Sequence, residues 1–335
     1  MTRTITARTI TALGEHFPLA TPFRISRGIK TAADVVTVTI SQDGVSGHGE
    51  CVPYPRYDES VPGAIAQIET IHRAIEQGAG RRELIDLLPA GAARNAVDCA
   101  LWDLELRLSG SDMASAMGLH RPLQPIATAM TVGLDTPEAM GVAAAALAHV
   151  PLIKVKVDGS DPAAQMRAVR AAAPTPRMIV DPNESWSIAE VRDLQELMQE
   201  LRIDLLEQPL PAHEDEALRG FRSAIPIAAD ESIHIAADLD QLPDGYDVVN
   251  IKLDKAGGLT AALDLADAAQ ARGLGIMTGC MICSSLSIAP AWAVAVRSAF
   301  VDLDGPLWLS ADRKGGVIGT DGLLSPPQPG FWGGL

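Results

Sequence analysis

Between residues 125 and 304 the sequence alternates short apolar segments with segments of helical pattern, and this alternation constrains the fold more than any other feature. Three helical segments begin with a capping residue followed by proline, or by glutamate three positions on: Thr136, Asp161 and Ser187. The apolar segments have the length and composition of buried strands, and eight occur, at 125–132, 153–157, 177–181, 203–207, 226–230, 247–251, 274–278 and 300–304. Strands separated by seven helical segments predict an α/β fold, a modified TIM barrel of the form (β/α)7β.

The residues before the barrel have a different pattern. The first 55 residues alternate polar and apolar side chains as strands do, whereas Ile65, Ile68, Ile71 and Ile75 recur at helical spacing. We therefore predict an α+β capping domain over 1–120, the barrel over 121–304, and a tail over 305–335 that returns to the capping domain. Two segments rich in proline, at 17–28 and 51–60, are expected to be irregular, the first as a mobile loop.

The composition excludes several classes of function. The 335-residue chain has a formal net charge of −15, whereas proteins that bind nucleic acid or anionic membranes need a basic face. No apolar run has the length of a membrane span, and the N-terminal residues lack the apolar core of a signal peptide. The cysteines Cys51, Cys99, Cys280 and Cys283 form no paired framework. We expect a cytoplasmic protein with reduced thiols and a small-molecule substrate.

The carboxyl ends of barrel strands are where catalytic residues of such folds lie. Three consecutive predicted strands end in a carboxylate, namely Asp181, Glu207 and Asp230. A single one is commonly a helix cap, but three would crowd at the barrel mouth, where like charges cannot all stay ionised without a cation. Because ligands that are all oxygen select a hard ion, we predict one Mg²⁺ per active site, held by these three carboxylates.

The second barrel strand contains Lys154 and Lys156, which lie one residue apart and therefore on one face. Lysines on a solvated edge strand are the alternative interpretation. With a metal at the mouth, Lys156 and Lys255, just past the sixth strand, would face each other across the substrate. One lysine can remove a proton next to a metal-bound carboxylate and the other can return it. Lys154 and the cation would favour the neutral form of Lys156 that a base requires.

Several motifs of the predicted barrel fit one known family. They are Lys154-Val155-Lys156, Asp181-Pro182-Asn183, Glu207-Gln208-Pro209, Asp230-Glu231-Ser232 and the run NIKLDKAGG at 250–258. Together they resemble the enolase superfamily, in particular its subgroup of muconate-lactonising enzymes; a mandelate racemase relative would have a histidine where Thr278-Gly279-Cys280 stands. The resemblance spans nearly the whole chain. It implies the capped barrel, Mg²⁺, a lysine on each side of the substrate and a homo-oligomer.

The substrate prediction rests on Asp302 and Asp304, which share a face at the end of the eighth strand and would bind an ammonium group. A polar turn before Gly305 is the alternative. The pair is similar to the Asp-x-Asp with which dipeptide epimerases hold the free amine of their substrate. The resemblance therefore implies a dipeptide epimerase, with L-Ala-D/L-Glu as the first expected substrate.

Other expectations about the pocket follow from the same resemblance. Arg24 is predicted to bind the glutamate side chain, with an ordinary surface arginine as the alternative, and Thr131 is predicted to line the pocket. The roles of Cys283 and Asp254, where relatives often have other residues, stay open. The alternative functions are o-succinylbenzoate synthase, muconate cycloisomerase or N-acylamino acid racemase and, more remotely, a non-catalytic barrel that binds small acids.

Overall fold

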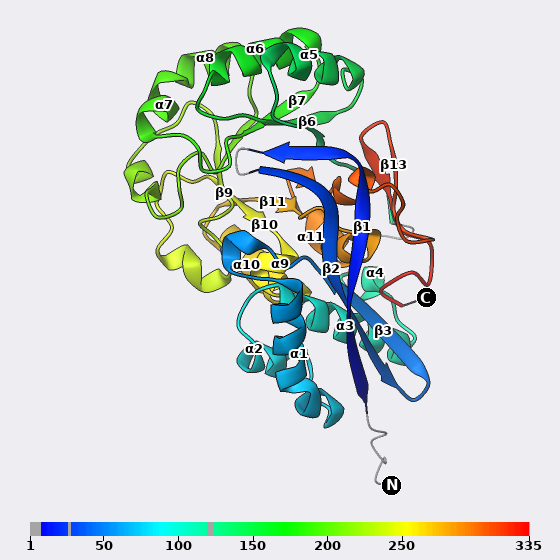
Figure 1. Ribbon diagram of the computed structural model, residues 1–335. Coiled ribbons are helices and arrows are strands. Elements are labelled where there is room, and N and C mark those ends of the chain that lie inside the picture. The colour runs from blue at the N-terminus through cyan, green and yellow to red at the C-terminus, as the bar shows by residue number, and fades with distance from the viewer. Residues whose placement is uncertain (1–7, 26–27, 119–122, 335) are drawn as a thin grey trace.

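The computed structural model describes residues 8–25, 28–118 and 123–334. Its central element is a sheet of eight parallel strands in the order β5 to β12 (Figure 1). The strands are β5 (Met130–Val132), β6 (Leu152–Lys156), β7 (Arg177–Asp181), β8 (Leu205–Glu207), β9 (Ile227–Ala229), β10 (Val248–Ile251), β11 (Gly275–Gly279) and β12 (Phe300–Asp302). The backbone N–H of Ala129, just before β5, donates to the Val301 carbonyl at 2.7 Å, which nearly closes the barrel. The predicted barrel is confirmed.

Helical segments lie between the strands, as the sequence predicts. They are α5 (Pro137–Ala146), α6 (Pro162–Ala172), α7 (Ile188–Asp193), α8 (Gln195–Glu200), α9 (Leu253–Ala256), α10 (Leu259–Ala271) and α11 (Ser285–Ala295), with the 3₁₀ helices η2 (Asp215–Leu218) and η3 (Ala236–Asp240) after β8 and β9. Thr136, Asp161 and Ser187 each accept a hydrogen bond from the first turn of the helix that follows. These caps set where α5, α6 and α7 begin. No helix of the described residues is long and apolar enough to cross a membrane.

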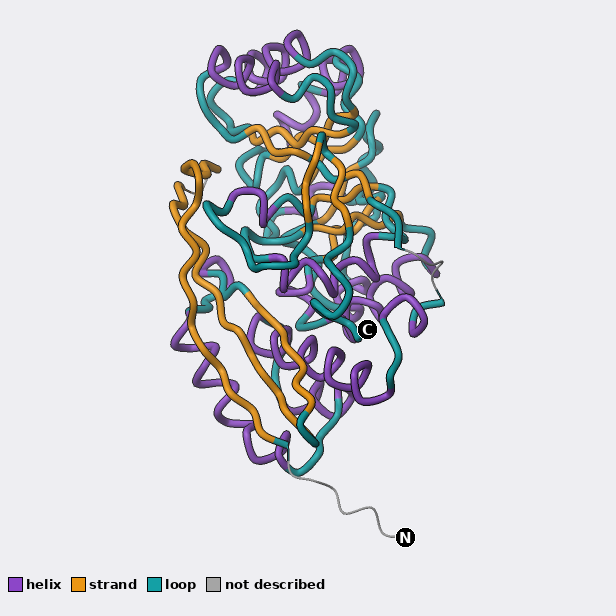
Figure 2. The backbone as a smooth tube through the Cα atoms, turned by 90° about the vertical axis from the view of Figure 1, so that its right-hand side faces the viewer, coloured by secondary structure: helices purple, strands orange, loops and turns teal. Residues whose placement is uncertain are grey.

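The capping part combines an antiparallel sheet with helices. The strands are β1 (Thr9–Ile25), β2 (Gly28–Gln42) and β3 (Val45–Cys51); α1 (Val61–Glu76) and α3 (Ala92–Ser109) pack against this sheet, α2 (Arg81–Leu87) packs against α3, and α4 (Met113–Ala116) follows. The predicted helix face of Ile68, Ile71 and Ile75 is buried. A Cβ atom at Gly49 would collide with the backbone carbonyl of Ala96, so glycine lets β3 approach α3 closely. Figure 2 shows the long strands of this sheet running from the cap helices up to the barrel.

The segment 17–28 differs from the expected loop. Its described part, up to Ile25, continues β1 and pairs with β2 as far as Ile25 opposite Gly28, with a register shift between Pro18 and Phe23. Ser26 and Arg27 lie outside the described residues. Prolines are tolerated here because β1 is the edge strand of its sheet, where a missing N–H removes no necessary ladder bond. The described residues on either side of the hairpin tip, up to Ile25 and from Gly28, therefore form a strand pair, and the N–H of Leu134 in the barrel donates to the Arg24 carbonyl at 3.2 Å.

The tail after β12 contacts both parts of the protein. Following η4 (Gly305–Trp308), the strands β13 (Ile318–Thr320) and β14 (Leu323–Ser325) form a sheet with β4 (Ile126–Ala127). Further on, the Trp332 indole N–H donates to the His48 carbonyl at 2.9 Å, and the N–H of Met113 donates to the Gly333 carbonyl at 2.9 Å. The predicted boundary at residue 120 lies outside the described residues, and the domain limits stay predictions.

Candidate active site

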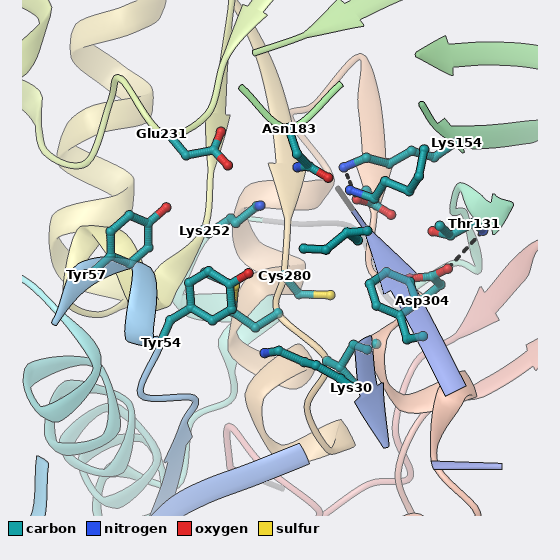
Figure 3. A pocket seen from close by; sticks show the side chains of 17 residues that line it. Lys30, Tyr54, Tyr57, Thr131, Lys154, Asn183, Glu231, Lys252, Cys280 and Asp304 are labelled. Atoms are coloured by element: carbon teal, nitrogen blue, oxygen red, sulfur yellow. Dashed lines mark hydrogen bonds and ion pairs between the residues drawn. The ribbon is translucent and has the colours of Figure 1, made fainter. Parts of the chain in front are cut away.

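A pocket lies at the carboxyl ends of the barrel strands, under the β1–β2 hairpin and the segment that follows β3 (Figure 3). The cap contributes Phe23, Ile25, Lys30, Tyr54 and Tyr57. The barrel side includes five of the residues predicted from the sequence: Thr131, Lys154, Lys156, Asp302 and Asp304. Strand ends far apart in the sequence thus meet in one cavity, together with a wall from the cap.

Lys154 and Lys156 both point into this pocket, and both are buried. The ammonium group of Lys156 lies 2.5 Å from Asp181 Oδ2. That of Lys154 lies within 3.0 Å of three carboxylates, at 3.0 Å from Asp181, 2.7 Å from Glu207 and 2.8 Å from Asp302. Burial would lower the pKa of Lys154, but these carboxylates outweigh it and raise the pKa well above its usual value. Lys154 is therefore a fixed positive charge.

The predicted metal ligands Asp181, Glu207 and Asp230 are fully buried at the ends of β7, β8 and β9. Burial and then the charge of Asp181 raise the pKa of Glu207 to about 7. Burial acts on Asp181 and Asp230 in the same direction. For Asp181, however, the ammonium groups of Lys156 and Lys154 outweigh it and hold the pKa of that carboxyl well below its usual value. At Glu207, therefore, the nearby lysines do not fully offset burial and the negative charge of Asp181.

The chemistry of these residues fits a hard cation. Glu207 Oε2, Asn250 Oδ1 and Asp302 Oδ1 are buried acceptors that receive no hydrogen bond from the described part of the chain; the contact of Glu207 with Lys154 lies outside hydrogen-bonding geometry. Unsatisfied buried acceptors are costly, and a cation bound by oxygen ligands would relieve that cost. Among the described residues, no three Asp, Glu, His or Cys side chains are grouped in the geometry of a metal site. The three carboxylates instead contact the ammonium groups of lysines.

After β10, Lys252 lines the pocket, whereas Lys255, which the sequence analysis predicts as the second base, does not. Lys252 lines the pocket, and its ammonium group lies 2.6 Å from Asp230 Oδ2. Lys255 does not line it, because α9 turns its side chain beneath the barrel mouth, where it donates to Asp230 Oδ1 at 2.6 Å, to the Ile233 carbonyl at 3.0 Å and to the Asn250 carbonyl at 3.1 Å. Burial lowers the pKa of Lys255, as expected of a base. Geometry decides, however, because a base must reach its proton.

Two sequence families cover this arrangement of cap and barrel. Residues 7–118 match the N-terminal domain of mandelate racemase / muconate lactonizing enzyme, and residues 138–331 match the enolase C-terminal domain-like family. The chain belongs to the mandelate racemase / muconate lactonizing enzyme family. It is therefore a member of the enolase superfamily, as its motifs indicate.

Relatives within this family act on small amino-acid derivatives. The chain is 45% identical to the L-Ala-D/L-Glu epimerase of Escherichia coli, over 95% of this chain and 99% of that protein. It is 46% identical to the N-acetyl-D-glutamate racemase of a Pseudoalteromonas species, over 90% and 95%.

Solved structures of the family extend the comparison. A crystal structure of an Agrobacterium tumefaciens family member with homology to dipeptide epimerases, with bound sodium and L-Ala-L-Glu, superimposes with a TM-score of 0.94 at 48% identity, covering 97% of this chain and all of that one. The dipeptide epimerase of Methylococcus capsulatus, complexed with Mg and L-Arg-D-Lys, does so with a TM-score of 0.85 at 33% identity, covering 97% and 98%.

In the present structure, Arg24 is exposed on β1 and does not line the pocket. Among the described residues of the hairpin, Lys30 on β2 is the cation that lines the cavity, and its ammonium group lies 4.3 Å from the centre of the Tyr54 ring. Thr131 lines the pocket as predicted, and its backbone N–H donates to Asp304 Oδ2 at 3.0 Å. Burial, and then the charge of Asp302, raise the pKa of Asp304 to about 6.

Sequence reasoning missed several residues of the pocket, among them Lys30, Tyr54, Tyr57, Glu231 and Lys252. Two of these left a usable signal. Lys252 directly follows a predicted strand, and Glu231 directly follows the strand-end carboxylate Asp230. Lys30 left none, because a cap residue reaches the barrel mouth only through the tertiary packing of the two parts. The four cysteines are free thiols, as expected.

Proposed function

We propose that this protein is a Mg²⁺-dependent dipeptide epimerase, an isomerase that moves a proton at the α-carbon of the C-terminal residue, with L-Ala-D/L-Glu as its first substrate. One observation carries the proposal: Lys156 at the end of β6 and Lys252 just after β10 line the same pocket. These strands are four positions apart in an eight-stranded barrel, so the two lysines enter from opposite sides. That is the arrangement that proton transfer on two faces of one carbon requires.

Each lysine has a distinct part in the reaction. Lys156 would remove or return the proton on one face of the α-carbon and Lys252 on the other, while Lys154 remains charged and orients the carboxylates around it. Asp181, Glu207 and Asp230 would hold the Mg²⁺, which, when bound, stabilises the negative charge that develops on the substrate carboxylate as the α-proton leaves. Phe23, Ile25 and Lys30 of the cap hairpin, together with Tyr54, line the pocket from the cap side and would limit the access of water.

The two ends of the substrate meet opposite charges. Asp302 and Asp304 would bind the free amine, supported by Thr131. We propose Lys30, rather than the exposed Arg24, as the partner of the glutamate side-chain carboxylate, because Lys30 is the cation that the described part of the cap places in the pocket. A cytoplasmic location and a homo-oligomer stay part of the proposal.

Incubation of the protein and Mg²⁺ with L-Ala-L-Glu in deuterated water tests this function directly. We expect epimerisation together with uptake of one deuteron at the α-carbon, read by mass spectrometry and NMR. A panel of dipeptides that shows neither uptake nor epimerisation contradicts the proposal.

A racemase of N-acylated glutamate is the second candidate, and a specific observation favours it. Asp302 already pairs with Lys154 at 2.8 Å, and Asp304 accepts hydrogen bonds from the Thr131 N–H at 3.0 Å and the Trp308 indole at 3.2 Å. The pair is thus partly satisfied without an ammonium group, and one relative acts on N-acetyl-D-glutamate. Comparing kcat/KM for L-Ala-L-Glu and N-acetyl-L-glutamate separates the two. In the epimerase, Asp302→Asn with Asp304→Asn lowers kcat/KM for the dipeptide by about 10- to 100-fold and spares the acetylated substrate.

A further inference from the structure

The cap segment 52–57, between β3 and α1, supplies two aromatic side chains to the pocket. Tyr54 and Tyr57 line it, their ring centres lie 5.7 Å apart, and the Tyr57 ring stands edge-on to His234 at 4.7 Å. Glu59 fixes the segment from the cap side, since its carboxylate accepts the Tyr54 N–H at 3.0 Å. The position of the segment over the barrel depends on contacts that cross between the two parts of the protein.

The first of these contacts is made by Asp254. This residue lies on α9, two positions after the pocket residue Lys252, and it is buried. Its Oδ1 accepts the backbone N–H of Val52 at 3.0 Å, across 202 residues of sequence, and the side-chain amide of Asn95 at 2.8 Å. Asn95 also donates to the Glu50 carbonyl at 3.3 Å. Both hydrogen bonds are accepted by Oδ1. We therefore expect that a neutral side chain with an oxygen acceptor in this position can hold the segment as well as the carboxylate does.

The second contact lies at the other end of the segment. Arg56 donates to Glu184 through Nε at 2.9 Å and through a terminal nitrogen at 2.8 Å, a two-bond pair of fixed geometry. Glu184 is mostly buried and directly follows Asn183, which lines the pocket. Both Asn183 and Glu184 have positive φ, at 48° and 67°, a backbone conformation that non-glycine residues seldom adopt unless the surroundings hold them there.

We infer that Asp254 and Glu184 are positioning residues that hold the cap segment 52–57 at both ends, and so set Tyr54 and Tyr57 against the barrel side of the substrate pocket. Each attachment point is within two residues of a pocket residue, Lys252 or Asn183, so movement of the cap segment and of the barrel wall is linked. This inference rests on the proposed function for its kinetic consequence. The attachment itself is independent of the reaction.

Variants at Asp254 separate the hydrogen bonds from the charge. Asp254→Asn keeps the Oδ1 acceptor, whereas Asp254→Leu removes it at similar size. Loss of a buried hydrogen bond of this kind makes the segment open about tenfold more often, and we expect amide hydrogen exchange in 52–57 to accelerate by about that factor in Asp254→Leu. The same variant should raise KM for the dipeptide about tenfold, with kcat changed less than about threefold. Asp254→Asn should stay within about twofold of the wild type in both.

Two arginine variants complete the design. Arg56→Gln breaks the partly exposed second attachment and should raise KM by about two- to fivefold. The matched control is Arg82→Gln, because Arg82 pairs with Asp264 at 2.5 Å and also joins the cap to the barrel, from α2 to α10, away from the pocket. It should change neither the exchange of 52–57 nor KM.

The exchange and KM measurements can each support or overturn the inference. Unchanged exchange of 52–57 in Asp254→Leu, or an equal rise of KM in Arg82→Gln, overturns the inference. If Asp254→Leu does not fold, Arg56→Gln against Arg82→Gln still decides it. A wild-type protein that turns over no dipeptide refutes the proposed function instead, and the exchange measurement continues to test the attachment.

Discussion

Replacing Lys252 and Lys255 separately by methionine distinguishes the catalytic lysine from the structural one. Lys252 lines the pocket and forms one ion pair, with Asp230 at 2.6 Å. Lys255 is 2% exposed and bonds the same carboxylate together with the carbonyls of Asp230, Ile233 and Asn250. The first substitution therefore removes a group that faces the substrate, and the second removes the donor from a closed buried network.

The expected magnitudes are opposite in the two variants. Removing one partner of a buried ionic network costs roughly 3–5 kcal/mol of unfolding free energy, which is the loss we expect for Lys255→Met. Lys252→Met leaves Asp230 bonded to Lys255, so we expect a smaller loss of roughly 1–2 kcal/mol. Loss of a positioned proton-transfer group should, by contrast, reduce epimerisation by about 10²- to 10⁴-fold in Lys252→Met.

Urea unfolding and stereospecific exchange in deuterated water measure the two effects. Lys252→Met should still exchange the α-proton of one of the two substrate isomers, L,L or L,D, because Lys156 remains on its own face. It should no longer interconvert them. The assignment is refuted if Lys255→Met is as stable as the wild type and loses exchange on a single face while Lys252→Met epimerises normally.

Three further predictions concern specificity, pH and metal. Lys30→Glu should lower kcat/KM for L-Ala-L-Glu relative to the neutral L-Ala-L-Gln by about 10- to 100-fold, and an unchanged ratio in initial-rate assays contradicts the role of Lys30. Burial raises the pKa of Asp98 from 3.8 to about 6. Its contribution to stability is therefore present below pH 3.8 and is lost as the pH rises through 6. Between pH 5 and 8, the unfolding free energy of the wild type, measured with urea, should fall by about 1–2 kcal/mol more than that of Asp98→Asn. A chelator should abolish epimerisation and added Mg²⁺ restore it, and Asp181→Ala should not be restored at the same Mg²⁺ concentration.

Local patterns in the sequence predicted the barrel well, because each rests on short-range physics. Apolar strands, capped helices and the placement of strand-end carboxylates follow from the alternation of side chains and from parallel strands ending at one edge. The segment 17–28 was predicted wrongly as a loop, because its prolines were interpreted as loop signals. Its described residues form an edge strand, which tolerates proline. Lys30 was not predictable, because its place in the pocket depends on how the cap docks on the barrel.

In contrast, the rule that predicted the positions of Lys154 and Lys156 could also have predicted which of the two lysines after β10 lines the pocket. Side chains alternate along an extended chain, and Asn250 points to the barrel mouth, where it donates to Glu207 Oε1 at 2.9 Å. Lys252 is still extended, with φ −116° and ψ 128°, so it shares that face two residues later. Lys255 comes after the chain has turned into α9, where the period of two no longer applies. Extending β10 by one residue, to the point where helical conformation begins, therefore identifies Lys252 as the lysine that lines the pocket.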